Sequence, residues 1–243
     1  MSGRPGFNAG KVLAPTGRLR VGAFAGSPLS MTRDPATGEI HGLSIDLGRE
    51  FAKRLGVPFE QRDYQRIAEV LAGMKAGDVD FTISNATPAR AVDVDFSQTL
   101  ISLELGYLVP AASPIATMSD VDRPGLRIGV TQGSTSQRTI PNLLPNAIVT
   151  PARNSRHAVE MLERHELDLF ATNKPTLFQM SDQMPGARVL DGRWGVEHIA
   201  IAIPRGREPA LEVVRRFVEE VQTGGLLAEA VARAGLRGLV KAR

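Results

Sequence analysis

The sequence of 243 residues contains no cysteine. Disulfides, thiol catalysis, cysteine zinc sites and a lipidated cysteine anchor are therefore excluded within this chain. It also lacks an apolar run of membrane-spanning length, and its first residues, MSGRPGFNAGKVL, lack the apolar core of a secretory signal. If the protein is exported, we expect its signal to lie outside this chain.

Charge of one sign is not concentrated anywhere along the chain. The 29 Lys and Arg residues are interspersed with 26 Asp and Glu residues, which leaves a net charge of only +3. A basic stripe of the kind that binds nucleic acid is missing, so we expect no nucleic-acid partner. With 42% hydrophobic residues, the chain can bury one sizeable core or two modest ones.

Common catalytic and metal-binding motifs are also absent. The sequence has no P-loop, no G-x-S-x-G elbow and no G-x-G-x-x-G turn. Asp78 and Asp80 of GDVD are typical of a turn followed by a strand rather than of a catalytic pair. Since these motifs are missing, we expect no catalytic residue and no cofactor. We also expect no metal, because four histidines lack metal-ligand spacing: His41, His157, His165 and His198.

Strand and helix patterns alternate along most of the chain. Apolar periodicity predicts a β-α-β-α-β run with strands at 18–24, 57–61 and 79–84 and helices at 44–56 and 66–77. Ser44 and Gly56 are expected to cap the first helix, and Gly77 to end the second. A second run has strands at 126–130, 147–151 and 167–172 and helices from 134, from 155 and from about 174. Two such halves imply two parallel-sheet domains.

Two extended apolar stretches belong to neither run. One lies at 103–116, between the halves, and the other lies at 198–206, before an amphipathic helix at 208–225. Because these last elements need a sheet to cover, we expect the chain to cross back to the first domain. The predicted fold is α/β, with two Rossmann-like lobes joined by two hinge strands. Their predicted bounds are 11–107 plus 200–243 for the first lobe and 108–199 for the second.

Arg90, in the segment TPAR, stands where a cation is disfavoured. Thr87 is a suitable N-cap and Pro88 suits the first position of a helix, so Arg90 is expected near the positive end of a helix dipole. Either Asp93 or Asp95 pairs with it at the surface, or the site holds an anion from outside the chain. The local sequence leaves both alternatives open.

The order of several segments resembles that of the family 3 extracellular solute-binding proteins of ABC importers. The matching segments lie between about Arg18 and Leu236 and include GLSIDLGREFAKRLG, VLAGMKAGDVDFTIS, ATPAR, VDFS, IGVTQGST and LDLFATN. The resemblance implies a type II periplasmic binding protein fold, in which two α/β lobes close on a ligand. Most members of that family bind polar amino acids.

The resemblance also implies a set of ligand-binding residues. Arg90 would form two charge-assisted hydrogen bonds with a ligand carboxylate. Ser134 or Thr135 would open a helix whose free N–H groups face the cleft, and Asn85 would present polar groups at a strand end. The predicted ligand-binding set is Phe24, Ile67, Asn85, Thr87, Arg90, Ser134, Thr135 and Asn173.

Departures from the family pattern bear on the ligand. Members usually carry an aspartate that pairs with the ligand ammonium five residues after the position of Asp168, where this chain has Asn173. Members stack their ligand on aromatic residues, where Phe24 or Leu29, together with Ile67, would here give a more apolar wall. Lys174 is a candidate second cation. We therefore expect a carboxylate ligand that lacks an α-ammonium or holds it differently.

These features favour a periplasmic receptor of an ABC importer that performs no chemistry. As a monomer, it would capture a small carboxylate, such as an amino acid, an amino-acid derivative or an organic acid, and present it to membrane permease subunits. The alternative is an enzyme on the same fold, since cyclohexadienyl dehydratases resemble these binding proteins and bind a carboxylate through the matching arginine. Such an enzyme needs a general acid, for which Glu197 and Asp191 are the candidates. The sensor lobe of a larger receptor is a third interpretation.

Overall fold

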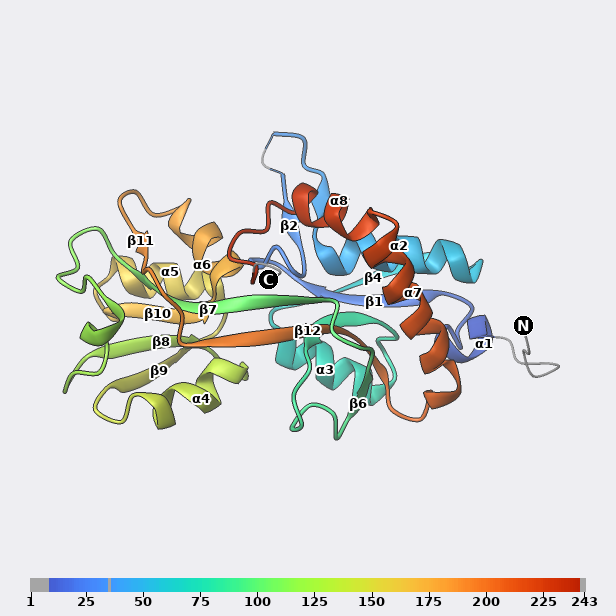
Figure 1. Cartoon of the computed structure of the whole chain (residues 1–243), viewed down its shortest axis with the longest axis horizontal. Helices are drawn as coiled ribbons and strands as arrows, with labels where there is room; N and C mark the ends of the chain where they lie inside the picture. Colours follow the sequence, from blue (N-terminus) through green and yellow to red (C-terminus); the bar gives the residue numbers. More distant parts are fainter. Residues whose placement is uncertain (1–8, 35, 241–243) are drawn as a thin grey trace.

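The computed structural model describes residues 9–34 and 36–240. The first half contains α1 (Ala9–Leu13), β1 (Leu19–Phe24), β2 (Thr32–Arg33), β3 (Ile40–His41), α2 (Leu43–Leu55), β4 (Phe59–Tyr64), α3 (Ile67–Ala76), β5 (Thr82–Asn85) and β6 (Val94–Phe96). After β7 (Ile101–Val109) come η1 (Met118–Asp120), β8 (Arg127–Thr131), α4 (Thr135–Leu143), β9 (Ile148–Ala152), α5 (Ser155–Glu163), β10 (Leu169–Asn173), α6 (Lys174–Ser181) and β11 (Arg188–Val189). The chain returns along β12 (Gly195–Pro204) to η2 (Glu208–Ala210), α7 (Leu211–Thr223) and α8 (Leu226–Arg233) (Figure 1). The predicted alternation is confirmed, and no helix in these ranges has the length and apolar character needed to cross a membrane.

One long sheet runs through both halves of the molecule. Its strand order is β5-β12-β7-β10-β8-β9, with β6 beside β12 and β11 beside β7. The central strands β7 and β12 are antiparallel partners that pass from one half to the other (Figure 1). The predicted parallel pairing is present at β1–β4, β8–β9 and β8–β10, whereas the pairs made by β7 and β12 are antiparallel.

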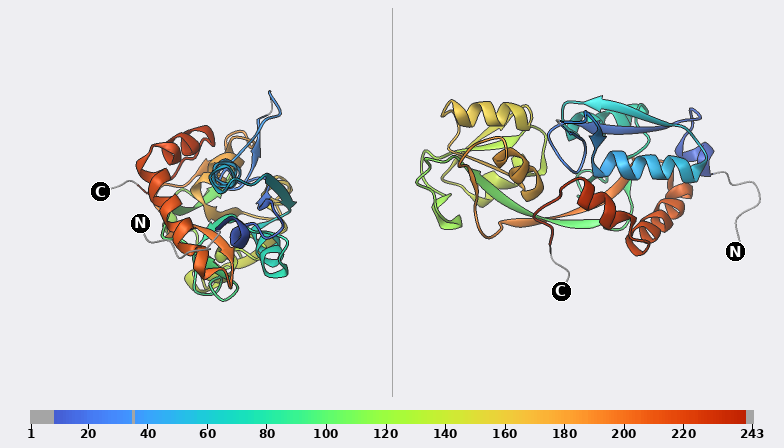
Figure 2. Two further views of the ribbon diagram at one scale, coloured as in Figure 1. Left: turned by 90° about the vertical axis from the view of Figure 1, so that its right-hand side faces the viewer. Right: turned by 90° about the horizontal axis from the view of Figure 1, so that it is seen from above.

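Buried apolar side chains form separate groups at the two ends of β7 and β12. One group surrounds Phe51, whose ring lies 5.6 Å from that of Phe81 and 4.7 Å from that of Phe217, and it joins α2, β1 and α7. The other end packs on both faces of the sheet, around Val130 on one face and Phe170 on the other. We call β1–β6 with η2–α8 the first lobe and η1–β11 the second lobe; Figure 2 shows them side by side. The residue bounds given above stay a prediction, because β7 and β12 pass through both lobes.

The ends of the helices confirm most of the predicted caps. Gly56 and Gly77 adopt left-handed backbone conformations, with φ of 69° and 81°, and end α2 and α3. Ser134 caps α4 through its side chain. The prediction for Ser44 is wrong. It lies inside α2, and its hydroxyl donates to the Leu29 carbonyl oxygen (3.3 Å).

Each lobe joins its first parallel strand to a later one through an arginine and an aspartate. Arg20 of β1 donates from its backbone N–H, Nε and Nη2 to the Asp80 carboxylate (3.1, 2.8 and 2.9 Å). Arg127 of β8 makes the same three bonds to Asp168 (2.7, 3.1 and 2.7 Å). The Asp80 side chain is fully buried and also pairs with Arg207 (2.8 Å), whereas the Asp168 side chain is 31% exposed. Asp80 therefore joins Arg20 of β1 and Arg207 before η2 through a fully buried carboxylate.

The segment after α8, residues 237–240, lies along β7, and we call it the tail segment. Leu239 forms an antiparallel bridge with Leu103, and backbone hydrogen bonds to β7 (both 3.0 Å) flank this bridge. Arg237 pairs with Asp182, which follows α6, and lies over the ring of Phe178. The tail segment thus links the first lobe to the second beside β7 and β12.

Candidate ligand-binding site

A cavity lies between the two lobes, where β1, β5 and β10 end and where α3, α4, α5 and α6 begin. The carboxyl ends of parallel strands are the usual ligand site of α/β proteins, and helix starts carry N–H groups that have no partner within the helix. Seven of the eight predicted ligand-binding residues line the cavity: Phe24, Ile67, Asn85, Arg90, Ser134, Thr135 and Asn173.

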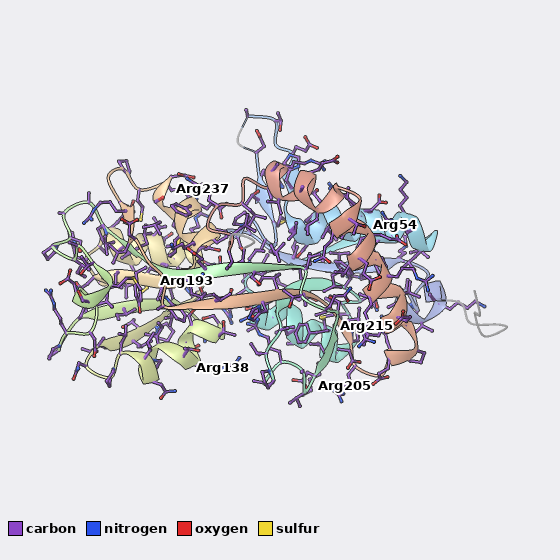
Figure 3. All side chains as sticks on the ribbon, viewed as in Figure 1. Arg54, Arg138, Arg193, Arg205, Arg215 and Arg237 are labelled. Carbon is purple, nitrogen blue, oxygen red and sulfur yellow. The ribbon has the colours of Figure 1, made fainter. Side chains whose placement is uncertain are left out.

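Thr87 does not cap a helix, and the predicted helix after it is wrong. Residues 88–93 form a series of turns held by two backbone bonds to the Thr87 carbonyl oxygen (3.0 and 2.9 Å). Arg90 therefore does not lie in a helix dipole. Thr87 instead lines a neighbouring groove together with Arg138, which extends from α4 on the side that faces the first lobe (Figure 3).

Arg90 is buried beside neutral groups. Its Nη1 donates to the Ser84 hydroxyl (2.8 Å) and to the Asn85 carbonyl oxygen (3.3 Å), and only 8% of the residue is exposed. Burial lowers the pKa of Arg90 to about 10, an effect that the charge of Glu197 opposes and the charge of Arg138 reinforces. The guanidinium is thus still a cation at neutral pH, in a place that water reaches poorly.

The surface pairing considered for Arg90 is wrong. Asp93 pairs with Lys75 (2.8 Å) and Asp95 with Arg205 (3.8 Å). Within residues 9–34 and 36–240, Arg90 forms no ion pair. A buried charge without a counter-charge is unfavourable, so the cavity is suited to an anion that is not part of the chain.

The start of α4 supplies the second-lobe side of the cavity. The Ser134 hydroxyl accepts from the Gln137 N–H (3.2 Å), and the Gln137 side chain in turn accepts from the Gly133 N–H (2.6 Å). Thr135 Oγ1 donates to Glu197 (2.7 Å). This arrangement fixes the hydroxyl groups that face the first lobe.

Asn173 faces the cavity at the junction of β10 and α6. Its Oδ1 accepts from the Thr176 N–H (3.2 Å), which caps α6, and its Nδ2 donates to Glu197 Oε2 (3.2 Å). Lys174 lies elsewhere, because its Nζ pairs with Glu104 of β7 (2.7 Å) and the residue does not line the cavity. The prediction of a second cation at Lys174 is wrong.

Glu197 of β12 is the one acidic residue that lines the cavity in the described part of the chain. The sequence pointed to it only as an acid for the enzymatic alternative, together with Asp191, which is exposed and outside the cavity. A charged residue inside the apolar strand GVEHIAIAIP was the available signal. Residues 9–34 and 36–240 contain no group of three or more His, Cys, Asp or Glu side chains that could hold a metal.

The two lobes contact each other beside the cavity. Ser155 of α5 donates to the Gly26 carbonyl oxygen (2.9 Å), and Gly133 lies against Ala68 of α3. A Cβ added at Gly133 would lie 2.6 Å from the Ala68 Cβ. This distance is too short for two carbon atoms, so the contact requires glycine at 133.

Gly133→Ala should weaken ligand binding by preventing the lobes from meeting. Overpacking of this kind costs about 1–3 kcal/mol, or roughly 5- to 150-fold in affinity. Gly125→Ala is the matched control, since Gly125 also lies in the second lobe with positive φ (80° against 75°) but has open space around it. Calorimetry should show the loss for Gly133→Ala alone. Equal losses in both variants would assign the effect to backbone strain.

Residues 19–235 match the model of the bacterial extracellular solute-binding proteins, family 3. The chain belongs to this family. This family 3 protein is 22% identical over 197 residues to the ABC transporter glutamine-binding protein of Bacillus subtilis (strain 168), covering 79% of this chain and 72% of that protein. It is 26% identical over 200 residues to the glutamine-binding protein of Geobacillus stearothermophilus, covering 81% and 76%.

The fold of this family 3 protein is that of the type II periplasmic binding proteins. A solved amino acid ABC transporter substrate-binding protein from Streptococcus pneumoniae, bound to L-arginine, superposes with a TM-score of 0.81. The match covers 97% of this chain and all (100%) of that one, at 20% identity. Similarity at this level establishes the architecture, whereas the ligand depends on the residues that line the cavity of this chain.

Proposed function

We propose that this chain is the solute-binding component of an ABC importer, which captures a small carboxylate between its lobes and delivers it to membrane permease subunits. The observation that carries this proposal is Arg90, a buried cation at the cavity that pairs with no acid of the described residues. A ligand carboxylate would compensate it through charge-assisted hydrogen bonds. The names of the two glutamine-binding relatives point to amino acids and their derivatives.

We also propose that the protein acts in the periplasm as a monomer. Both sides of the cavity come from one chain, so a second copy is not needed to complete the site. The family is one of extracellular proteins, which supports the location.

The dehydratase-like alternative has less support. A general acid must hold a proton to give to the substrate, but the Glu197 oxygens already accept hydrogen bonds from Asn85 (3.2 Å), Thr135 (2.7 Å) and Asn173 (3.2 Å). Donors on both oxygens suit an ionised acceptor. We expect no turnover of prephenate or arogenate when either is incubated with the protein and followed by absorbance. Product formation at catalytic rates would favour the enzyme.

Ligand binding should make the protein more compact and more stable. If the lobes rotate at β7 and β12, closure on a ligand reduces the radius of gyration in solution scattering. Binding to the folded state alone also raises the melting temperature with ligand concentration. Native mass spectrometry of the purified protein should first identify a bound carboxylate. Identical scattering profiles with and without saturating ligand would contradict a hinged receptor.

A further inference from the structure

The tail segment pairs with an edge of β7 that the named strands leave open. Among the described residues, 101–104 pair with β12 on one side, whereas β10 and β11 pair with β7 only farther along the chain. The Glu104 N–H donates to the Gly238 carbonyl oxygen, and the Val240 N–H donates to the Ser102 carbonyl oxygen (both 3.0 Å). An open strand edge presents unpaired N–H and C=O groups. The tail segment therefore completes the sheet where the chain passes between the lobes (Figure 1).

The tail segment also packs against the second lobe. A Cβ added at Gly238 would lie 2.3 Å from the Lys174 Cβ, and the backbone of Gly238 is left-handed, with φ of 76°. Arg237 pairs with Asp182, and its guanidinium carbon lies 4.8 Å from the centre of the Phe178 ring. Because the tail segment follows α8 of the first lobe, these contacts join the lobes in addition to β7 and β12.

Lys174 connects the tail segment to β7 and α6. Its Nζ pairs with Glu104 of β7 (2.7 Å), and only 12% of its side chain is exposed. Glu104 also pairs with Arg193, which precedes β12 (3.3 Å). The side chain of Lys174, which does not line the cavity, thus lies between the first residue of α6, the strand β7 and Gly238.

All these contacts are made in an arrangement in which the lobes meet at the cavity, where Ser155 donates to the Gly26 carbonyl oxygen (2.9 Å). Contacts that exist in one arrangement favour it over any arrangement in which they are lost. A further bonded strand also restricts the lobe orientations that the protein can adopt without a solute. Binding then has less disorder to remove, so it becomes tighter.

We propose that the tail segment is a third, short strand of the hinge, which holds the lobes in this arrangement and thereby raises the affinity of the cavity for its solute. The effect on affinity rests on the proposed function. The mechanical role does not, since it concerns how far the lobes move in the absence of a solute. Residues outside the cavity therefore contribute to binding.

The first test compares Gly238→Ala with Gly235→Ala in protein without added solute. Both glycines have positive φ (76° and 60°), but a Cβ at Gly235 meets no atom within 4 Å. Alanine at 238 should push the tail segment away from Lys174 and break the bond to the Glu104 N–H. The Glu104 amide should then exchange its hydrogen for deuterium roughly 5- to 10-fold faster, and the radius of gyration in solution scattering should rise. Equal exchange and equal scattering in the two variants would refute the third strand.

The second test measures affinity for L-glutamine by calorimetry, a probe chosen from the names of the two relatives. Arg237→Ala removes the ion pair that joins the lobes. Arg233→Ala removes a similarly exposed arginine (50% against 47%) whose partner, Asp46, lies in the same lobe (3.8 Å). Affinity should fall by about 2- to 5-fold in Arg237→Ala and further in Gly238→Ala, and should stay at the wild-type value in Arg233→Ala.

Two results would overturn the effect on affinity: wild-type affinity in a folded Gly238→Ala protein, or equal losses in Arg237→Ala and Arg233→Ala. Failure of the wild type to bind L-glutamine would instead count against the ligand class suggested under the proposed function. The exchange and scattering measurements would still decide whether the tail segment belongs to the hinge.

Discussion

Arg90→Ala should abolish ligand binding and leave the fold intact. Removing the guanidinium leaves the ligand carboxylate buried without a partner, which costs about 3–5 kcal/mol, or roughly two to four orders of magnitude in affinity. The folded state should lose little, because the two hydrogen bonds that the desolvated cation makes to described residues go to neutral side-chain and backbone groups. Calorimetry and urea denaturation measure the two effects separately.

Two further variants sharpen this result. Arg90→Lys keeps the charge but cannot form two parallel bonds, so it should recover part of the affinity. Arg205→Ala removes an exposed arginine that pairs with Asp95 (3.8 Å) and should bind ligand normally. Wild-type affinity in a folded Arg90→Ala protein would remove Arg90 from the site.

Asp80→Asn should destabilise the protein by about 3–5 kcal/mol, since it leaves the buried Arg20 and the partly buried Arg207 facing an uncharged amide. Asp80 accepts three hydrogen bonds from Arg20 and pairs with Arg207 (2.8 Å), and its side chain is fully buried. Loss of the charge cannot be offset by water at that place. The denaturant midpoint in chemical unfolding reports the change.

Asp168→Asn is the matched control for this prediction. It removes the charge from a carboxylate that accepts the same three bonds in the second lobe, but the side chains of Arg127 and Asp168 are 39% and 31% exposed. Exposed pairs contribute about 1 kcal/mol or less. A loss at Asp168 as large as that at Asp80 would mean that the bonding pattern, and not burial, determines the stability of each lobe.

Apolar periodicity was enough to predict the helices and strands of the two alternating runs and the helix at 208–225, because each lobe buries one face of each of these helices against a sheet. Local chemistry was less reliable at the helix starts. Ser44 has the side chain of a cap, but its hydroxyl donates to the carbonyl oxygen of Leu29, 15 positions earlier in the chain. Thr87 and Pro88 look like a helix start, yet the next strand, β6, begins at Val94, and turns fill the interval. Tertiary contacts decided both cases.

The candidate site could be predicted only in part from the sequence, because tertiary contacts assemble much of it. Arg90 belongs to a short segment with a recognisable pattern, whereas the surroundings of Glu197 are assembled from distant positions. Its donors Asn85, Thr135 and Asn173 lie 112, 62 and 24 residues away along the chain. Strand patterning marks Glu197 as a charged residue in an apolar segment, but the partners that surround it depend on how the two lobes meet.

The tail segment has a consequence for how long a bound solute stays in place. Arg237 follows α8 of the first lobe along the chain, whereas Asp182 and Phe178 belong to the second lobe, so we expect opening of the proposed hinge to shift this contact as well as bend β7 and β12. Both charged side chains are about half exposed (47% and 60%), and such a pair is weak enough to break and re-form readily. If the lobes close on a solute as proposed, its residence time should therefore depend partly on Arg237 and Asp182, which do not line the cavity.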